Sequence, residues 1–487
     1  MPLIDESSDL WYNLIGTNHD LEVTIMDGIA NALFQYDKKD IPVFYDESTE
    51  KLTVYFNDEG VALPDHMDKI IVKRLGLLTD GLILYKLSVP LFNTCAIMDG
   101  DTLVNVAQGM QNSDVDYYIR DYKPESTYTE MRLQFAELNY FLPSIGRAEI
   151  TDKQIVLSRE KDQIYNFDII FKGAKIDISF ETKTKATSNC QVNAETYSEL
   201  TLKFPKTSDI DFLIELYIRT RNFFAFVCNR QNIALRDAIL IGSYMGKGLD
   251  EEKRIVDKEY RTQQKICFNQ KYLEPLENAK NSKKVLNIGY FASKLKELFQ
   301  LFFEKEGEEE ACVNSGSIHH SFKYRNLIDL EHSLHITATF EYYVRTILPE
   351  MSSTSTIEFI EDMKKLLDEY IGSTSGKKKA KAKSFRKGLK PQISLEEKIL
   401  KAYNGYGDWA SLSEVLLEWF GVDVSDLADA ANEWRNELAH EKREYCPDVK
   451  AIRAIRLVEH LNYCIILRKV GYSNEEIKNI IQEILAR

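Results

Sequence analysis

The stretch from Leu427 to His440, LADAANEWRNELAH, is the part of the sequence that best predicts a fold. Its apolar residues recur at spacings of four, three and four, at Leu427, Ala431, Trp434 and Leu438. That spacing places them on one face of a helix, and such a face must pack on other elements. We therefore expect this stretch to be one helix of a bundle.

The polar residues of the same stretch suggest chemistry. Arg435, Asn436 and His440 combine a permanent cation, an amide and a titratable imidazole near the predicted end of the helix. Cleavage of a phosphodiester needs a group that moves a proton near neutral pH and a fixed positive charge for the pentavalent phosphorane. The macrodipole of the helix favours the cationic form of a histidine at its C-terminus, which suits a proton donor.

Helix geometry limits what these residues can do within one chain. Asn436 and His440 share one side of an ideal helix, whereas Arg435 lies roughly 140° from His440 around the axis. Both side chains reach one phosphate only if the helix bends or ends near His440, or if a second copy of the chain supplies partners. The alternative is that they are solvated residues on an exposed face, since the pattern R-x-x-x-x-H is weak by itself.

Helical periodicity continues from about residue 290 to the end of the chain. Pro349, Gly421 and Gly471 are the expected stops or breaks. The predicted helices are Tyr324 to Leu348, Ile357 to Tyr370, Leu412 to Phe420, Ser425 to His440, Asp448 to Val470, and Ser473 to the end.

The first of these helices is apolar on two sides. One stripe comprises Leu327, Leu330, Leu334 and Ala338, and the other comprises Ile336, Phe340, Tyr343 and Ile347. A helix of this kind is buried twice, once by its own bundle and once by a partner. Glu341 and Arg345 continue the first stripe, either as a partly buried charge pair or as residues facing water.

The first 290 residues predict a different architecture. Apolar residues alternate with polar ones over Tyr165–Phe171, Ile176–Phe180 and Leu200–Phe204, with a hairpin turn at Lys172-Gly173-Ala174. Further candidate strands are Leu52 to Phe56, Lys69 to Leu75, Gly81 to Ser88 and Met131 to Leu138. A helix is expected from Asp209 to Cys228, with Ser208 as its N-cap.

These patterns predict an α+β multidomain chain. Its N-terminal half is rich in antiparallel, sandwich-like β-structure and is followed by an all-α helical bundle. We expect a first β-rich domain over 1–145, a second β-rich domain with one helix over 146–290, and the helical domain over 291–487. A chain of 487 residues is too long for a single core.

The charge distribution is uneven. There are 62 basic and 76 acidic residues, which give a net charge of −14, so an RNA-binding surface would have to be a local basic patch. The segment Lys377 to Lys390 is such a patch, with eight basic residues and no acidic one. It would either clamp RNA phosphates or be a solvated loop. The candidate RNA-binding residues are Lys377, Lys378, Lys379, Lys381, Lys383, Arg386 and Lys387.

Cysteines and histidines predict neither a metal nor a cofactor. The seven cysteines are scattered, which indicates reduced thiols in a cytoplasmic protein. His319 and His320 are adjacent in a predicted loop, and His332 and His335 are three residues apart on the first helix without the acidic or cysteine partners that would complete a metal site. The N-terminus lacks a signal-peptide pattern, and no apolar run is long enough to span a membrane.

The order of these motifs resembles that of HEPN domains. The resemblance rests on Phe340-Glu341-Tyr342-Tyr343-Val344-Arg345 in a long first helix, on Arg435-Asn436-Glu437-Leu438-Ala439-His440 at the end of a later helix, and on a further long helix. The whole layout, together with the phrase Phe135 to Leu142, is similar to that of ApeA-type bacterial anti-phage proteins.

The resemblance implies a metal-independent RNA endonuclease that acts as a homodimer or higher homo-oligomer, with RNA, transfer RNA included, as substrate. Arg435, Asn436 and His440 would be catalytic, with Glu341 and Arg345 in support. The activity would serve abortive infection, and a phage-derived trigger would act through the N-terminal half. The rival hypothesis is a non-catalytic HEPN-like sensor that only dimerises and binds.

Overall fold

The computed structural model confirms the predicted fold class, with antiparallel β-structure in the N-terminal half and helices in the C-terminal region. The structure describes residues 29–36, 39–46, 51–56, 69–74, 82–87, 95–99, 102–106, 109–123, 125–143, 146–151, 154–159, 164–189, 191–249, 254–268, 285–304, 318–319, 328, 330–348, 354–389, 393–421, 423–439 and 447–485.

The chain divides into two compact units. Unit 1 comprises residues 1–123 and 266–271, and unit 2 comprises residues 124–265 and 272–487. Unit 2 therefore contains both the second set of strands and the helices. The domain boundaries expected after residues 145 and 290 stay predictions.

Unit 1 is built on a closed antiparallel barrel. Its strands follow the order β8-β3-β2-β1-β4-β5, and β5 pairs again with β8 to close the ring. Val115, Tyr117 and Ile119 alternate along β8 and are buried, as expected for one face of a strand. The strands are β1 (Ile29–Tyr36), β2 (Lys39–Asp46), β3 (Lys51–Phe56), β4 (Lys69–Arg74), β5 (Leu82–Leu87) and β8 (Gly109–Tyr122), with a separate hairpin of β6 (Cys95–Asp99) and β7 (Thr102–Val106).

The sheet of unit 2 has the order β12-β13-β14-β9-β15-β16. The predicted alternation is confirmed, because Ile169, Phe171, Ile176, Ile178, Phe180, Leu200 and Leu202 are all buried. Lys172 and Gly173 form the predicted turn, both at positive φ. The strands are β9 (Thr127–Leu133), β12 (Tyr165–Phe171), β13 (Ala174–Asn189), β14 (Gln191–Thr207), β15 (Asp237–Leu249) and β16 (Ile255–Phe268), with a hairpin of β10 (Gly146–Thr151) and β11 (Gln154–Arg159).

Two local predictions in this region are wrong. The strand predicted over Met131 to Leu138 ends at Leu133, and α2 (Ala136–Phe141) follows it. The buried Leu138 and Phe141 are three residues apart, a spacing that suits one face of a helix. The N-cap of α3 (Ile210–Cys228) is Asp209 and not Ser208, because the Asp209 carboxylate accepts hydrogen bonds from the amides of Asp211 and Phe212.

Most of the C-terminal helices pack against α11 (Val449–Val470), whose residues 457–467 are all buried. Gly471 ends α11 at a φ of 100°, as predicted, and Asp448, the expected first residue of the helix, is its N-cap. The first predicted helix is described from Leu330, and Tyr324 to Leu327 lie outside the described residues. The other helices are α4 (Leu295–Leu301), α5 (Leu330–Thr346), α6 (Thr354–Ser373), α7 (Gly376–Gly388), α8 (Leu395–Asn404), α9 (Ser413–Phe420), α10 (Val424–Ala439) and α12 (Asn474–Leu485).

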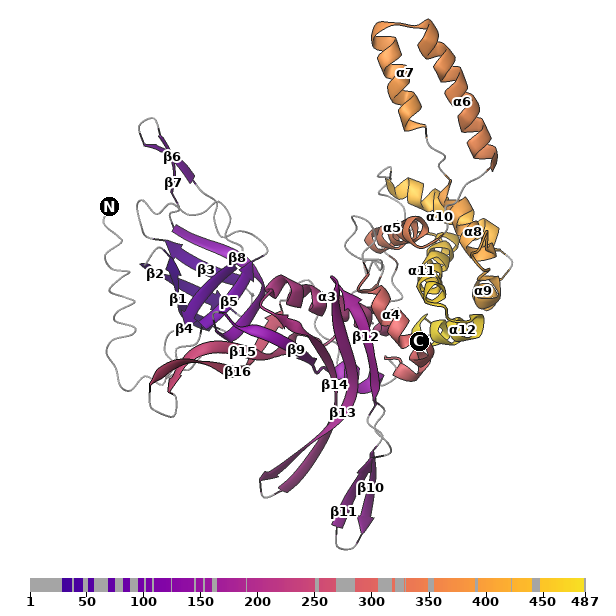
Figure 1. Ribbon diagram of the computed structural model, residues 1–487. Coiled ribbons are helices and arrows are strands. Elements are labelled where there is room, and N and C mark those ends of the chain that lie inside the picture. The colour runs from indigo at the N-terminus through magenta and orange to yellow at the C-terminus, as the bar shows by residue number, and fades with distance from the viewer. Residues whose placement is uncertain are drawn as a thin grey trace. The chain divides into compact units, whose positions relative to one another are not determined.

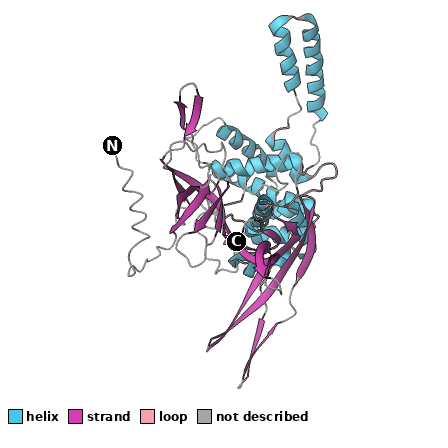
Figure 2. Ribbon diagram, turned by 60° about the vertical axis from the view of Figure 1, so that its left-hand side comes forward, coloured by secondary structure: helices cyan, strands magenta, loops and turns pink. Residues whose placement is uncertain are grey.

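Sheet and helices of unit 2 share one aromatic core, and Figure 2 shows the helices gathered beside the long strands. The Phe299 ring of α4 lies 6.2 Å from that of Phe180 on β13 and 4.7 Å from that of Phe223 on α3. The Tyr463 ring of α11 stacks on Phe226 at 4.7 Å, and its hydroxyl donates to the side-chain oxygen of Asn229 at 2.8 Å. The helices therefore pack on the sheet region through continuous contacts.

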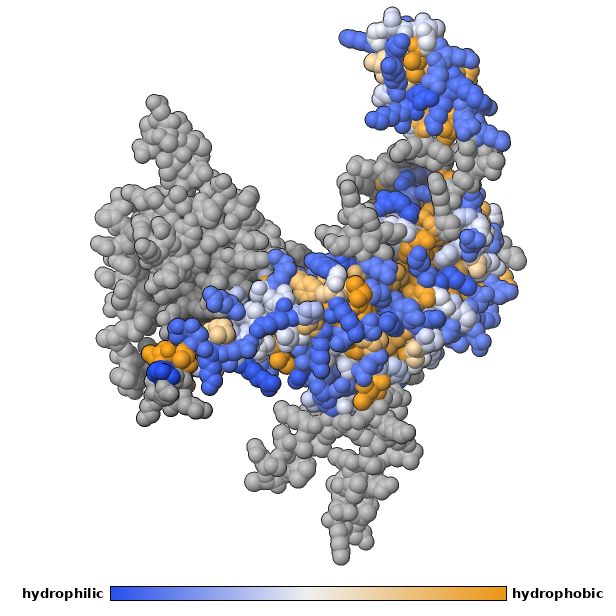
Figure 3. All heavy atoms as spheres, in the orientation of Figure 1, coloured by the Kyte–Doolittle hydropathy of each residue, from blue (hydrophilic) through white to orange (hydrophobic). Residues whose placement is uncertain are grey.

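The lysine-rich segment is helical as far as Gly388, so its interpretation as a solvated loop is wrong, and Lys390 lies outside the described residues. It forms α7, which pairs with α6 as a hairpin (Figure 1). Arg386 of α7 forms an ion pair with Asp368 of α6 at 2.6 Å. Apolar side chains on the hairpin, including Phe359, Leu366 and Phe385, are exposed and lie between charged ones (Figure 3).

Three cysteines of the described part, Cys228, Cys267 and Cys464, are free thiols. Within the described ranges, the structure contains no helix with the length and apolar character needed to cross a bilayer.

Candidate active site

Helix α10 holds the Arg-Asn pair at the surface of the bundle. Leu427, Ala431 and Trp434 are buried as predicted, which fixes the rotation of the helix about its axis. The Arg435 side chain is 40% exposed, and Asn436 is exposed beside it. The guanidinium of Arg435 donates to the side-chain oxygen of Asn436 at 3.5 Å, so the two polar groups lie together on the surface.

Glu341 of α5 connects this pair to a third helix. One carboxylate oxygen of Glu341 accepts from Nη2 of Arg435 at 3.3 Å, and the other accepts from Nζ of Lys398 on α8 at 2.9 Å. Glu341 and Lys398 are 30% and 23% exposed, so the network lies at the rim of the bundle and not in its core. One carboxylate thus orients two cations, which leaves the group with a net positive charge.

The other predicted site residues have different positions. Among the described residues, the ion pairs of Glu341 go to Arg435 and Lys398, and not to Arg345 one turn along α5. Arg345 is exposed, and its guanidinium lies over the Tyr342 ring at 5.5 Å from the centroid. His440 lies outside the described residues, directly after the last residue of α10.

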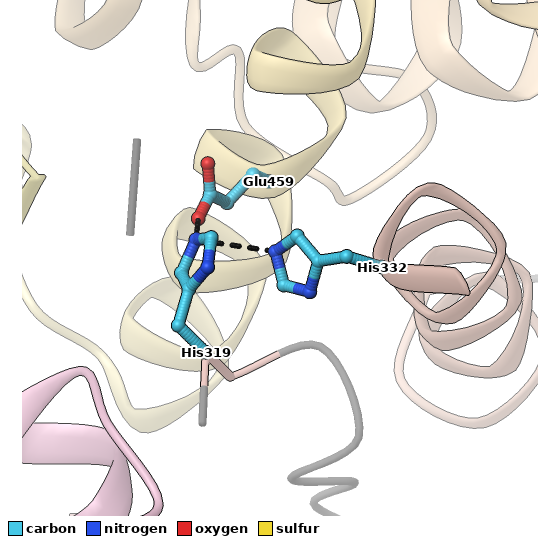
Figure 4. Close-up of side chains that lie close together, drawn as sticks. All are labelled: His319, His332 and Glu459. Atoms are coloured by element: carbon cyan, nitrogen blue, oxygen red, sulfur yellow. Dashed lines mark hydrogen bonds and ion pairs between the residues drawn. The ribbon is translucent and has the colours of Figure 1, made fainter. Parts of the chain in front are cut away.

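A second group of titratable side chains lies inside unit 2. His319, His332 of α5 and Glu459 of α11 point toward one another (Figure 4). Nε2 of His319 is 2.9 Å from Oε1 of Glu459 and 3.1 Å from Nε2 of His332. Burial alone would raise the pKa of Glu459, but the His319 hydrogen bond and the charge of Arg456 outweigh it and lower that pKa to about 2.

Residues 334–476 match the family model described as Apea-like HEPN. The chain contains a HEPN domain of the ApeA type. No curated protein and no solved structure matches the chain.

The HEPN domain runs from the second turn of α5 to the start of α12. It includes Glu341, Arg435 and Asn436, the position of His440, and Glu459. The barrel of unit 1 and the sheet of unit 2 lie before it in sequence. The predicted resemblance to HEPN domains is therefore confirmed for the helical region.

The sequence did not indicate Lys398 or Glu459 as site residues. Lys398 lies on α8, a helix that the periodicity did not predict, and Glu459 lies on α11, far along the chain from His332. A signal for α8 was present, because Ser394 accepts from the amide of Glu397 as an N-cap, and Glu396 and Glu397 occupy the first turn. Nothing local to His332 predicted Glu459.

Proposed function

We propose that this chain is a metal-independent RNA endonuclease of HEPN type that acts in anti-phage defence. The observation that carries the proposal is a surface-exposed, oriented arginine within a HEPN domain: Arg435 beside Asn436, held by Glu341. An ordered guanidinium at the surface is suited to a phosphate, because it is always charged and presents a fork of donors.

In the proposed reaction the 2′-hydroxyl of the RNA attacks the adjacent phosphorus, and the bond from phosphorus to the 5′-oxygen breaks. The products are a 2′,3′-cyclic phosphate and a 5′-hydroxyl. His440 moves the proton that the nucleophile loses or the leaving oxygen gains. Arg435 stabilises the charge of the phosphorane, and Asn436 orients the phosphate or Arg435 itself.

We propose that the active species is a dimer through α5. Leu330 and Leu334 on the first stripe of α5 are 39% and 41% exposed, whereas Ile336, Phe340 and Tyr343 on the second stripe are buried. Glu341 follows the exposed stripe, so a partner that covers it would bring a second copy of the Arg435 site close to the first. This arrangement would supply the convergence that one straight helix does not.

The basic helix α7 is a candidate surface for holding the RNA. Apart from Lys379, which is half-buried, its basic side chains are exposed, and Arg386 already pairs with Asp368. Neutralising phosphates releases counterions, which favours binding without reading sequence. Exposed Phe385 on the same helix offers a surface on which a base stacks.

We assign sensing or restraint to the part of the chain before the HEPN domain. A nuclease that cleaves cellular RNA must stay inactive until infection. The partner that would release this restraint is a phage-derived trigger that binds the β-rich region.

The test is cleavage of total RNA by the purified chain, without added divalent metal and with or without EDTA. The wild-type chain and an Arg453→Ala variant, which changes an exposed arginine of α11, should cleave and leave 2′,3′-cyclic ends. His440→Ala and Arg435→Ala should each lower the rate about 10²-fold or more. Equal cleavage by wild type and His440→Ala would overturn the proposal.

One observation favours the rival, a non-catalytic dimerising sensor. The ion pair with Glu341 gives Arg435 a structural partner, so Arg435 also helps to hold α10 against α5. If that were its only role, Arg435→Ala would lower the free energy of unfolding and the wild-type chain would show no cleavage. Measuring both quantities on the same variants separates the two functions.

A further inference from the structure

The His319–His332–Glu459 cluster joins three segments that are far apart in the chain. His319 lies in the short described segment 318–319, His332 near the start of α5, and Glu459 in the middle of α11. His319 and Glu459 are almost fully buried, and His332 is half-buried. One donor atom from each side chain lies within 4.8 Å of the other two.

Ordinary hydrogen bonds do not satisfy both neighbours of His319 in this cluster. Nε2 of His319 contacts both Oε1 of Glu459 and Nε2 of His332. A neutral imidazole nitrogen carries either one hydrogen atom or one lone pair, so Nε2 of His319 forms at most one linear hydrogen bond with these two neighbours. Whichever neighbour it bonds, Nε2 of His319 has no second hydrogen atom or lone pair for the other.

A cation among the three donor atoms would resolve the conflict, because each of them would then donate a lone pair to it. Zinc takes nitrogen and carboxylate oxygen at about 2.0–2.2 Å, so neighbouring donors in a tetrahedral site are roughly 3.3 Å apart. The two short donor separations, 2.9 and 3.1 Å, are close to that spacing. Two histidines and one carboxylate are also a ligand set that zinc uses.

We infer that His319, His332 and Glu459 bind one Zn²⁺ ion, with a water molecule as the fourth ligand. Hydrogen bonds from neighbouring residues hold Glu459 and the His319 backbone in place. The second oxygen of Glu459 accepts from Nη1 of Arg456 at 2.5 Å, which fixes the carboxylate. The backbone carbonyl of His319 accepts from the amide of Gln231 at 2.8 Å, and that of Ile318 accepts from the Gln231 side chain at 2.9 Å.

The ion has a structural role in this proposal. It ties α5 and α11 of the HEPN domain to segment 318–319, which Gln231 holds against the chain just after α3. It is separate from the proposed cleavage chemistry, since His332 and Glu341 are nine residues apart, or about 13 Å along α5. Zinc content and RNA cleavage are therefore independent readouts.

The test is metal analysis of the full chain after incubation with Zn²⁺ and removal of unbound ion. Wild type should retain about one zinc per chain, and His332→Gln should lose it. His335→Gln is the matched control, because His335 is an exposed histidine on the same helix and outside the cluster, and it should retain zinc. His332→Cys replaces one zinc ligand by another and should also retain it.

Thermal unfolding supplies a second measurement, the change in Tm on removing or adding zinc. Each protein is compared with itself, so the result does not depend on how well one variant folds. A chelator should lower the Tm of wild type and of His335→Gln, and added Zn²⁺ should restore it. The Tm of His332→Gln should respond to neither. Wild type without stoichiometric zinc, bound iron in place of zinc, or loss of zinc from His335→Gln would each overturn the inference.

Discussion

Glu341 is the residue on which the candidate active site depends most. Its two carboxylate oxygens serve different cations, Arg435 and Lys398, from different helices. A side chain of this kind fixes the direction of an arginine without contacting the phosphate itself. Its effect on cleavage should therefore be smaller than that of Arg435.

Glu341→Gln keeps the size of the side chain and removes its charge. We expect RNA cleavage to fall about tenfold, less than for Arg435→Ala, because Arg435 stays present and only its fixed orientation is removed. The measurement is the initial rate of cleavage at saturating RNA. Glu331→Gln, an exposed change on the same helix, should leave the rate unchanged. A Glu341→Gln enzyme as fast as wild type would show that the ion pair plays no part in catalysis.

At the scale of single residues, the sequence predicts the position of a site residue only where that position follows from local helical spacing. Arg435 and Asn436 lie on a helix whose rotation is set by Leu427, Ala431 and Trp434, so their exposure follows from spacing alone. Lys398 and Glu459 reach their partners through tertiary packing, which no local period encodes. The Asp209 cap shows the same limit on a smaller scale, since Ser208 and Asp209 are both good caps and only the geometry selects one.

Among the elements, α2 is stabilised by a charge pair with no access to water. Glu137 on α2 and Arg230 after α3 are both 0% exposed, and Glu137 also accepts from the amide of Ala234 at 2.9 Å. The prediction of a strand through this region was based only on the alternation of apolar residues. The prediction did not take into account that a buried carboxylate at Glu137 needs a partner, which Arg230 provides.

Removing one partner of this pair should destabilise the protein strongly. Glu137→Gln or Arg230→Met alone should lower the free energy of unfolding by about 3–5 kcal/mol, because a charge is left buried without compensation. The double variant should cost less than the sum of the two single changes. Chemical denaturation of the four proteins measures this, and strict additivity would contradict a direct interaction.

The basic face of α7 gives a prediction about binding. Changing Lys377, Lys378, Lys379 and Lys381 together to glutamine should weaken RNA binding and reduce its salt dependence. The log–log slope should fall by about 0.7 for each phosphate of a single strand that the lysines no longer neutralise. Lys364→Gln with Lys365→Gln on α6 is the control within the same hairpin. An unchanged slope for the α7 variant would place the RNA elsewhere.

For the whole molecule, the exposed stripe of α5 predicts the assembly. Leu334→Glu places a charge in the centre of the proposed dimer contact and should give a monomer without RNA cleavage. Leu417→Glu changes a leucine of α9 that is likewise exposed and should leave both properties intact. Sedimentation with a cleavage assay tests this, and a dimeric Leu334→Glu protein would move the contact to another surface.

For the whole molecule, the sequence predicts the fold class but not the order in which the strands pair. Alternation and helical period identified the β-rich and helical regions because each acts over a few residues. The closure of the barrel by β5 and β8 depends on pairing between distant strands, and the position of β9 between β14 and β15 does too. Those pairings follow from packing that only the complete chain defines.

The aromatic core between α3, α4 and α11 bears on how such proteins change by recombination. A gene segment that carried the helices alone, from residue 291 onward, would leave behind Phe226, on which Tyr463 stacks, and Phe223 and Phe180, which contact Phe299. A transplanted bundle would reach its new host with an uncovered apolar surface. Inheritance should therefore keep the strands of unit 2 and the HEPN helices together.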